Sequence, residues 1–249
     1  MKAQRGTRAI AAAALASLLL SGFAAPARAD DGDPFEGFNR GIWWFDDRLD
    51  RYFLEPVAIS WEWITPQFLR TGLRNAFDNL RFPLRFVNDL LQADVQQAGR
   101  EVGRFAINST LGVAGLWDPA SRYGLELRDE DFGQTLAVWG VPPGAFLMLP
   151  VFGPSGVRDT AALPLDLALG AWPSLISPTT GIAINVTERI NTRARLIDDV
   201  RELRAASLDY YVAVRNAYRQ LRAARVQNGE VPDEETSDDL YELYEEGDE

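Results

Sequence analysis

The chain has 249 residues, of which 47% are hydrophobic, so it is long enough for one large domain or two small ones with a substantial core. It contains no cysteine and no histidine. Disulfide frameworks, thiol nucleophiles, Cys/His metal sites and imidazole acid–base chemistry are therefore excluded. The formal net charge of −11 argues against a nucleic-acid partner, because phosphate groups repel an acidic surface.

The first 29 residues have the pattern of an export signal. Basic residues precede an apolar run from Ala9 to Ala25, and the small-x-small site Ala27-Arg28-Ala29 follows. We expect a signal peptide over 1–29 with cleavage after Ala29. The alternative is an uncleaved anchor, since the apolar run approaches the roughly 20 residues that span a bilayer. Either interpretation sends the rest of the chain across the inner membrane.

The segment after this signal has helical periodicity and an unusually aromatic face. Asp33 stands at an N-cap position before a proline, which predicts the start of a helix that continues to Phe53. Its main apolar stripe follows a spacing of three and four residues and consists of Phe35, Phe38, Ile42, Phe45, Leu49 and Tyr52. Trp43 and Trp44 widen this stripe. Because tryptophan suits the boundary between lipid tails and headgroups, we expect membrane contact or, as the alternative, core packing alone.

Two later stretches lack charged residues but contain prolines. Residues 132–157, which include Trp139 and Phe146, and residues 167–187 carry no charge, so hydropathy alone suggests transmembrane spans. Proline removes a backbone donor and breaks a helix, so neither stretch forms one straight spanning helix. Non-helical backbone is tolerated at membrane depth only where protein shields it or where it faces a watery cavity. We therefore expect either a buried core or shallow immersion in one leaflet.

The remaining body is also helical in pattern. Periodicity predicts short helices over 66–82 and 84–92, separated at Pro83, and a longer helix over 94–110. The apolar side of that longer helix consists of Val95, Ala98, Val102, Phe105 and Ala106. Residues 111–128 are rich in glycine and turn residues, which predicts a loop. Because no alternating strand pattern of useful length is present, we expect an all-α fold.

The last helical pattern runs from about Thr180 to Arg225 and is expected to bend near residues 207–209. One face carries an arginine row that either meets phosphates or acidic partners or is simply solvated; its members are Arg215, Arg219, Arg222 and Arg225. From residue 230 onward the chain has eleven acidic residues and no basic one. Because self-repulsion opposes compaction, we expect a disordered acidic tail over 229–249 after a helical domain at 30–228.

Candidate catalytic groups are few. The sequence GPSGV at 153–157 is not a nucleophile elbow, because its second glycine falls one position early and no histidine is present. The acidic run Asp129-Glu130-Asp131 offers carboxylates for glycoside hydrolysis, although adjacent acids on a turn also cap helices. We therefore expect no enzymatic activity, no cofactor and no metal site.

Six sequence blocks along the body form a recognisable series. They are DPFEGFNR (33–40), LDRYFLEPVA (49–58), NDLLQAD (88–94), RFAINSTLGVAGLWDPA (104–120), EDFGQTLAVWGV (130–141) and GPSGVRD (153–159). These blocks stand in the order seen in the MlaA, or VacJ, family of outer-membrane phospholipid-transport proteins, which the chain resembles over about residues 33–226. No single block carries the resemblance.

The resemblance implies an all-α, ring-like bundle of amphipathic and broken helices around a central amphipathic channel, with long Pro/Gly-rich loops. It implies a place at the periplasmic face of the outer membrane, in the inner leaflet and often beside trimeric porins. Phospholipid misplaced in the outer leaflet would pass through the channel to a soluble periplasmic carrier, which maintains lipid asymmetry. The alternative is a structural, porin-associated envelope protein without transport activity of its own.

The chain departs from the family pattern in two respects. Typical members carry a cysteine for acylation, which this chain lacks, and the acidic tail has no explanation in the resemblance. We therefore expect an exported, non-lipidated protein that its aromatic surface and its partners hold at the membrane. This is physically reasonable because a single acyl chain binds only marginally, whereas buried apolar area contributes about 25 cal/mol per Å².

A headgroup that crosses a low-dielectric layer needs a channel wall of mixed polar and apolar groups. The predicted lipid-channel or membrane-contact residues are Phe38, Ile42, Trp43, Trp44, Phe45, Asp46, Asp47, Trp139 and Phe146. Among them, Asp46 and Asp47 are expected near the channel. By resemblance, the loop at 111–128 corresponds to a mobile segment that controls the opening. Its candidate gating residues are Leu111, Gly112, Gly115 and Gly124.

Overall fold

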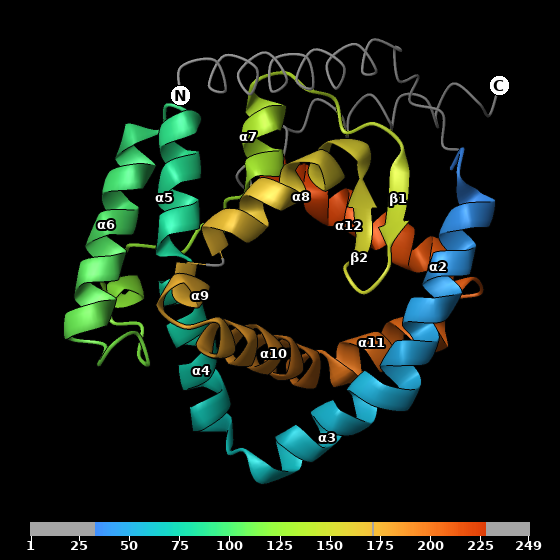
Figure 1. Ribbon diagram of the computed structural model, residues 1–249, viewed down its shortest axis with the longest axis horizontal. Coiled ribbons are helices and arrows are strands. Elements are labelled where there is room, and N and C mark those ends of the chain that lie inside the picture. The colour runs from blue at the N-terminus through green and yellow to red at the C-terminus, as the bar shows by residue number, and fades with distance from the viewer. Residues whose placement is uncertain (1–32, 171, 228–249) are drawn as a thin grey trace, which may run out of the picture.

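The computed structural model describes residues 33–170 and 172–227, most of which lie in helices (Figure 1). The expected export signal (1–29) and acidic tail (229–249) fall outside these residues. The first elements are α2 (Glu36–Leu49), η1 (Asp50–Leu54), α3 (Glu55–Ile64), α4 (Gln67–Leu80), α5 (Phe82–Leu91), α6 (Val95–Thr110) and η2 (Ala120–Tyr123). They are followed by α7 (Phe132–Val138), β1 (Phe146–Leu149), β2 (Gly153–Gly156), α8 (Val157–Gly170), α9 (Trp172–Ile176), α10 (Pro178–Arg195), α11 (Ile197–Ala206) and α12 (Tyr210–Val226).

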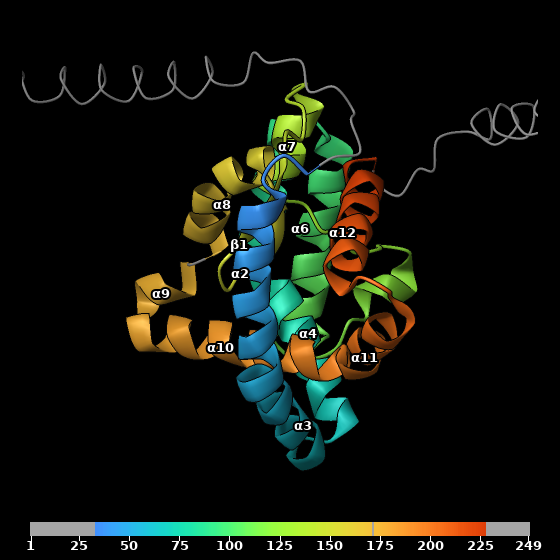
Figure 2. The same cartoon turned by 90° about the vertical axis from the view of Figure 1, so that its right-hand side faces the viewer.

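These elements surround a central opening. In Figure 1, α2 and α3 follow the right-hand and lower edges and α4, α5 and α6 follow the left. The helix α8 and the two strands lie above the opening, and α10 and α11 lie below it. Figure 2 shows that α8 and α12 lie toward opposite faces of the ring. The ring-like, helical architecture expected from the sequence is confirmed.

Three aspartates fix the starts of helices. Asp94, Asp131 and Asp209 stand at the N-caps of α6, α7 and α12, and each side chain accepts a hydrogen bond from the backbone amide three residues further on. Such a cap contributes about 1 kcal/mol, because it satisfies an amide that has no partner within the helix. The acidic run at 129–131 therefore includes a helix cap.

The aromatic helix differs from the expected one at both ends. α2 begins at Glu36, and Asp33 instead accepts a hydrogen bond from the amide of Phe35 (3.0 Å). The helical path does not stop at Phe53, because it widens into the π-helical turn η1 and continues as α3, which the sequence pattern does not predict. Pro56 lies in the first turn of α3, next to η1, where the regular backbone hydrogen bonding is already interrupted.

Other breaks fall close to their expected positions. α4 and α5 are separated at Arg81, so Pro83 lies in the first turn of α5 rather than between the two helices. The last helical pattern bends at residues 207–209 as predicted, because Asp209 caps a new helix there. A further break, at Leu196 between α10 and α11, is not predicted by the pattern.

The expected all-α class holds, with one short β-hairpin among the described residues that the sequence does not predict. β1 and β2 pair antiparallel, with Phe146 opposite Gly156 and Leu149 opposite Gly153. Each strand has only four residues, which is too short for an alternating pattern to stand out within an uncharged run. The chain reverses direction at residues 150–152, which we call the hairpin tip.

The packing of α6 reverses the rule for a surface helix of a soluble protein. Most of its apolar side is exposed: Val95 is 71% exposed, Val102 45% and Phe105 38%, although Ala98 is buried. The buried side of α6 also contains Gln97, Glu101, Arg104 and Asn108. The helix therefore directs its polar side toward the protein and most of its apolar side outward, whereas a soluble protein requires the opposite.

Polar side chains form much of the interior around α5, α6 and α7. Nε of Arg85 lies 2.9 Å from Oε2 of Glu101, and both side chains are at most 4% exposed. The hydroxyl of Thr135 donates a hydrogen bond of 2.7 Å to Oδ1 of Asn88. Burial, followed by the nearby charge of Glu101, raises the pKa of Asp89 to about 7. Paired charges and hydrogen bonds thus hold this part of the ring together.

The segments at the outer edge of the ring (Figure 1) carry many exposed apolar side chains, which we call the apolar rim. At the corner between α3 and α4, Trp63 is 88% exposed and Phe68 is 78% exposed. Other members are Phe38, Trp44, Phe45, Tyr52, Phe53, Val95, Val102, Leu111 and Trp117. Apolar surface of this extent marks contact with a membrane or a partner. Over 33–170 and 172–227, no helix combines the length and the apolar character that crossing a bilayer requires.

Replacing Glu101 with Gln tests the buried ion pair. The substitution leaves the buried Arg85 without its charged partner, so we expect the free energy of unfolding to fall by about 3 kcal/mol. The matched control is Glu36→Gln, because Glu36 pairs with Arg40 through side chains that are 46% and 38% exposed. That control should cost less than about 1 kcal/mol. Equal losses in chemical denaturation of the two variants would contradict an interior held by this pair.

Candidate functional site

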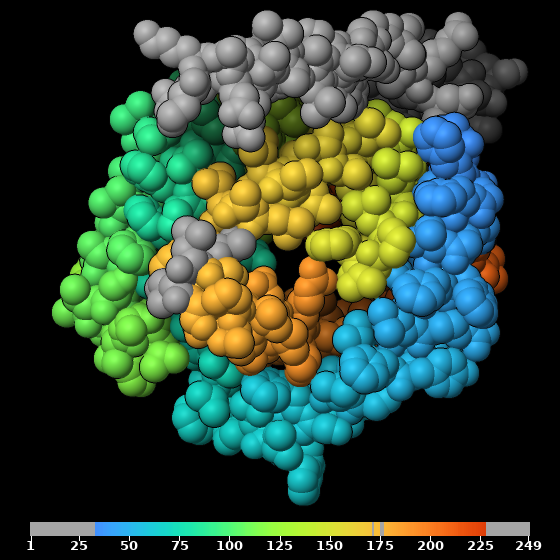
Figure 3. Space-filling model, viewed as in Figure 1, coloured from blue at the N-terminus to red at the C-terminus, as the bar shows by residue number. Residues whose placement is uncertain are grey.

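The central opening is the most prominent feature of the surface. Figure 3 shows it bordered by α8 in gold, by the β-hairpin in yellow and by α10 in orange. The hairpin tip reaches the edge of the opening (Figure 1). Segments far apart in the sequence therefore meet around one passage.

The hairpin tip is held from two sides. The backbone amide of Val151 donates a hydrogen bond of 2.8 Å to Oδ1 of Asp46 on α2. From α10, Nη1 of Arg189 donates to the carbonyl oxygen of Val151 at 3.3 Å. The Cζ atom of Arg189 also lies 5.2 Å from the centroid of the Phe152 ring, which is a cation–π distance. The tip thus links α2 with α10 at the edge of the opening.

The backbone of the tip has an unfavourable conformation. Val151 has a φ angle of 70°, in the left-handed region that β-branched residues avoid. Gly153, with a φ of 83°, adopts that region without steric cost. A strained residue of this kind costs about 1–3 kcal/mol and persists only where its surroundings impose it. The contacts with Asp46 and Arg189 provide such a constraint.

The two aspartates predicted near the channel have different surroundings. Burial raises the pKa of Asp46, although the hydrogen bond from the Val151 amide opposes the shift. Oδ2 of Asp46 is buried and has no hydrogen-bond partner among the described residues. Asp47 instead pairs with Arg51 at 2.8 Å and with Arg204 at 3.2 Å, which ties α2 to η1 and α11. Asp46 is therefore the member of the pair that contacts the hairpin tip.

Asn39 fastens the hairpin to α2 inside the protein. Its side-chain amide donates to the carbonyl oxygen of Phe146 (3.0 Å), and its side-chain oxygen accepts from the amide of Met148 (2.9 Å). Asp33 accepts hydrogen bonds from the Asn39 amide (2.9 Å) and from the hydroxyl of Tyr211. Neither Asn39 nor Tyr211 is among the residues predicted from the sequence. A lone amide on the apolar side of an aromatic helix is the signal that points to Asn39.

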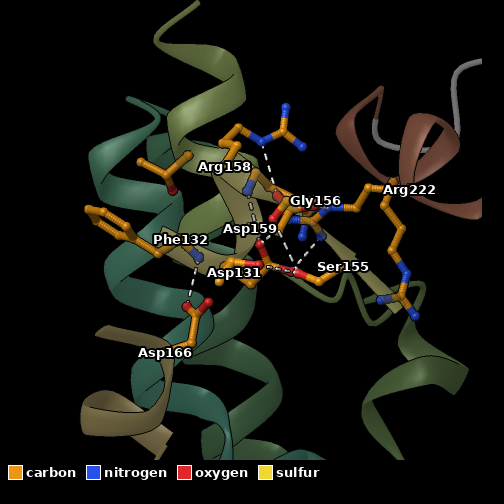
Figure 4. A network of polar contacts seen from close by, with 12 residues as sticks. Asp131, Phe132, Ser155, Gly156, Arg158, Asp159, Asp166 and Arg222 are labelled. Carbon is orange, nitrogen blue, oxygen red and sulfur yellow. Dashed lines mark hydrogen bonds and ion pairs between the residues drawn. The ribbon is translucent and has the colours of Figure 1, made fainter. Parts of the chain in front are cut away.

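A second polar network joins α7, α8 and α12 (Figure 4). Arg222 extends from α12 and pairs with Asp131 at 2.6 Å and with Asp159 at 2.9 Å. Tyr218 donates a hydrogen bond of 2.6 Å to Asp159. Burial opposes the ionisation of Asp159, but hydrogen bonds from Arg222 and Tyr218 and the charge of Arg222 hold its pKa below the usual 3.8. The predicted arginine row is therefore not only a solvated face.

Several predicted contact residues lie on the surface. Phe38 is 61% exposed, Trp44 57% and Phe45 47%, and all three lie on α2. Trp139 is also exposed, and its indole nitrogen donates a hydrogen bond of 3.0 Å to the carbonyl oxygen of Leu91. These positions suit contact with lipid or with a partner.

Other predicted contact residues point inward. Phe146, predicted as a channel or membrane contact, is only 3% exposed and belongs to the core. Ile42 and Trp43 are partly buried and pack against the cluster formed by Phe146, Met148 and Tyr211. The prediction for Phe146 is therefore corrected, because its strand turns this side chain toward Tyr211 rather than toward the surface.

The predicted gating segment at 111–128 lies beside the end of α6, at the lower left of Figure 1 and away from the opening. Asp118 ties the segment to α6 by accepting hydrogen bonds from Arg104 (3.1 Å) and Asn108 (2.9 Å). Leu111, at its start, is 65% exposed. A gating role for this segment stays a prediction. The segment found at the edge of the central opening is the hairpin tip.

The glycines of this segment have local structural roles. A Cβ atom at Gly112 would clash with the carbonyl oxygens of Asn108 and Trp117. Gly115 and Gly124 have φ angles of 88° and 73°, which other residues adopt only with strain. Turn geometry and close packing therefore account for glycine at these positions.

The family model for the MlaA lipoprotein matches residues 31–225, which extend from before α2 into the last turn of α12. The chain belongs to this family. It is 36% identical to the intermembrane phospholipid transport system lipoprotein MlaA of Escherichia coli (strain K12), over 91% of this chain and 92% of that relative. It is 30% identical to the protein of the same name from Haemophilus influenzae, over 93% of this chain and 95% of that relative.

A solved structure supports the same membership in the MlaA family. It concerns the structural basis for maintenance of bacterial outer membrane lipid asymmetry, and one of its chains matches with a TM-score of 0.68 at 35% identity. The match covers 78% of this chain and 99% of that chain. The resemblance drawn from the six sequence blocks is thus confirmed. The MlaA relatives are named as lipoproteins, whereas this chain contains no cysteine.

The acidic run at 129–131 has structural contacts in this member of the MlaA family. Asp131 caps α7 and pairs with Arg222. Glu130 is buried and accepts a hydrogen bond of 2.9 Å from Gln92. Within the part of the chain that the structure describes, no group of three or more carboxylates is arranged to hold a metal ion.

Replacing Asp159 with Asn tests the network around Arg222. The variant removes one charged partner of Arg222, so we expect the free energy of unfolding at neutral pH to fall by about 2 kcal/mol. Because folding lowers the pKa of Asp159, its contribution is complete above the usual value of 3.8 and is lost as the pH falls through the lower, folded value. The difference between wild type and variant should therefore shrink from about pH 4 toward about pH 2.

Asp198→Asn is the matched control, since Asp198 is an exposed residue of α11. Its free energy of unfolding should follow that of the wild type across the same acid titration. A deficit in Asp159→Asn that stays undiminished at the acid end would show that the charge of Asp159 is not what stabilises the network.

Proposed function

We propose that this protein transports phospholipid between the outer and inner membranes. It removes misplaced phospholipid from the outer leaflet of the outer membrane and passes it to a soluble periplasmic carrier. The observation that carries this proposal is an opening through a helical ring that has an apolar rim and many buried polar groups. Two relatives named as parts of an intermembrane phospholipid transport system support the substrate class. Passage through a ring breaks no bond, so we propose that the protein is not an enzyme.

A phospholipid in the opening presents a charged headgroup and apolar chains together. An unpaired charge is costly in a low-dielectric layer, so the headgroup needs polar partners along its path. Asp46 and Arg189 lie at the hairpin tip and supply charges of both signs beside the opening. Phe152, which is 47% exposed, offers an apolar surface next to them. This mixture suits an amphipathic passage better than a uniformly polar or uniformly apolar edge of the opening would.

We place the ring in the inner leaflet of the outer membrane, at its periplasmic face, because the apolar rim suits lipid tails. Trp63, Phe68 and Trp44 are the kind of side chains that immersion would bury. A large apolar side chain contributes roughly 1.5–3 kcal/mol when fully buried, so several of them exceed the marginal binding of one acyl chain. Attachment without a covalent lipid anchor is therefore part of the proposal.

A trimeric porin and a soluble periplasmic carrier are the proposed partners. The apolar rim offers lateral surface to a porin in the same membrane. A purely structural, porin-associated protein would use the same rim but would have no need of the opening.

Cross-linking the hairpin tip to α10 tests transport through the opening. Because the chain contains no cysteine, Phe152→Cys combined with Arg189→Cys introduces the only two thiols. A short bis-maleimide linker between them holds the tip on α10 at the edge of the passage. If passage requires movement of the tip, clearance of outer-leaflet phospholipid in a deletion strain carrying this variant should fall at least about fivefold.

The two single-cysteine variants are the controls; each is compared with its own untreated form, and the reagent should leave its clearance of lipid unchanged. Undiminished clearance by the cross-linked protein would mean that the tip does not control the opening. Normal outer-leaflet lipid in the deletion strain itself would count against transport and favour the structural alternative.

A further inference from the structure

A cavity of about 230 Å³ lies between the hairpin, α8 and α12. Phe152 of the hairpin tip lines this cavity and also lies against Arg189 of α10 at the edge of the opening. The cavity and the edge of the opening therefore share the side chain of Phe152. The volume suits several water molecules or one small polar headgroup, but it is too small for a whole phospholipid.

The cavity has an apolar wall and a charged wall. Leu149, Leu163 and Leu221 form the apolar wall together with Phe152. The charged groups around it are Asp131, Asp159, Asp166, Arg222 and Arg225. Three acids thus face two arginines, so the charged wall has one carboxylate in excess.

Two of these charged groups keep hydrogen-bonding capacity for a ligand. Oδ1 of Asp166 accepts a hydrogen bond of 2.8 Å from the amide of Phe132, and Oδ2 has no hydrogen-bond partner among the described residues. Arg225 is 44% exposed and forms an ion pair with Asp129 at 3.7 Å, which is too long for a hydrogen bond. Arg222, in contrast, is fully engaged by its two acids (Figure 4). The Asp166 carboxylate lies on α8 and the Arg225 guanidinium lies on α12.

We propose that this cavity binds the headgroup of a zwitterionic, amine-bearing phospholipid, with its ammonium at Asp166, its phosphate at Arg225 and the start of its chains along the leucines. The inference rests on the proposed function and adds a headgroup preference to it. The ammonium and the phosphate of the headgroup then each form a charge-assisted hydrogen bond with a side chain of opposite charge. A headgroup without an amine keeps its phosphate at Arg225 but offers the Asp166 carboxylate no cation, so it lacks one of the two charge-assisted hydrogen bonds.

The preference should depend on pH. Burial raises the pKa of Asp166 to about 6; the Phe132 amide and the charge of Arg222 oppose this shift, whereas the charges of Asp131 and Asp159 add to it. Asp166 is therefore ionised at about pH 7.5 and mostly protonated at about pH 5. The ammonium loses its partner at the lower pH, so the preference should be present at the higher pH and lost at the lower one.

The test is calorimetric titration of the full chain with dihexanoyl phosphatidylethanolamine and dihexanoyl phosphatidylglycerol, each below the concentration at which it forms micelles. We expect the amine-bearing lipid to bind about fivefold tighter at about pH 7.5 and equally at about pH 5. Free phosphoethanolamine lacks the chains that meet the leucine wall and should bind at least about tenfold more weakly than the lipid. Equal binding of phosphoethanolamine and the lipid would overturn the assignment to a lipid headgroup.

Asp166→Asn keeps an oxygen for the Phe132 amide but removes the charge, so it should weaken the amine-bearing lipid about fivefold and leave the anionic lipid nearly unchanged. Arg225→Gln should weaken both lipids, because both carry the phosphate. The exposed Asp198→Asn is the matched control and should bind like the wild type.

Equal affinity for the two lipids at the higher pH, or an Asp166→Asn variant that behaves like Asp198→Asn, would overturn the headgroup site. Neither result bears on passage through the ring, which the cross-linking experiment and the deletion strain test separately. The pH comparison uses the unmodified chain, so it decides the question even if a variant does not fold.

Discussion

The rest of this structure depends on one constraint: polar side chains face the interior of the protein and apolar side chains face outward. α6 buries Glu101 and Arg104 and exposes Val95 and Phe105, an arrangement that is unfavourable in water. In lipid the same arrangement is favourable, because polar groups must find partners within the protein while apolar ones face the tails. The buried pair of Arg85 and Glu101 is one such partnership. Since paired polar groups rather than a continuous apolar core hold the helices together, the ring can keep an opening at its centre.

The hairpin uses that interior to border the opening. Asn39, which is fully buried, binds the hairpin to α2 through the backbone of β1, and Asp46 and Arg189 hold the tip. The strained Val151 stays in place because these contacts impose its conformation. On its other side the same hairpin forms one wall of the cavity that contains Asp166. Control of the passage and recognition of a headgroup are therefore proposed for two faces of one short element.

Local sequence signals predict the helices well, but they do not predict whether the apolar side of a helix packs against protein or against lipid. Asp94 and the periodicity after it define α6 correctly, and the bend at 207–209 follows from a cap. The same periodicity fits a helix packed against a core or against lipid, because spacing does not identify what lies on the apolar side. The hairpin is missed since its strands are short and uncharged. Glycine is equally ambiguous in the sequence. A Cβ atom at Gly112, in the loop after α6, would clash with backbone, and one at Gly133, in α7, would clash with Arg222 and Asp159, so close packing requires glycine at both positions.

Immersion of the apolar rim in a single leaflet is measured most directly with spin labels. In vesicles of outer-membrane phospholipid, labels at Trp63→Cys and Phe68→Cys should be more accessible to oxygen than to a water-soluble nickel chelate. Their depths should lie within one leaflet, less than half of the roughly 30 Å hydrocarbon core. A label at Asp198→Cys should show the opposite accessibility. Nickel accessibility at 63 and 68 equal to that at 198 would contradict immersion and leave the reversed packing of α6 without a physical cause.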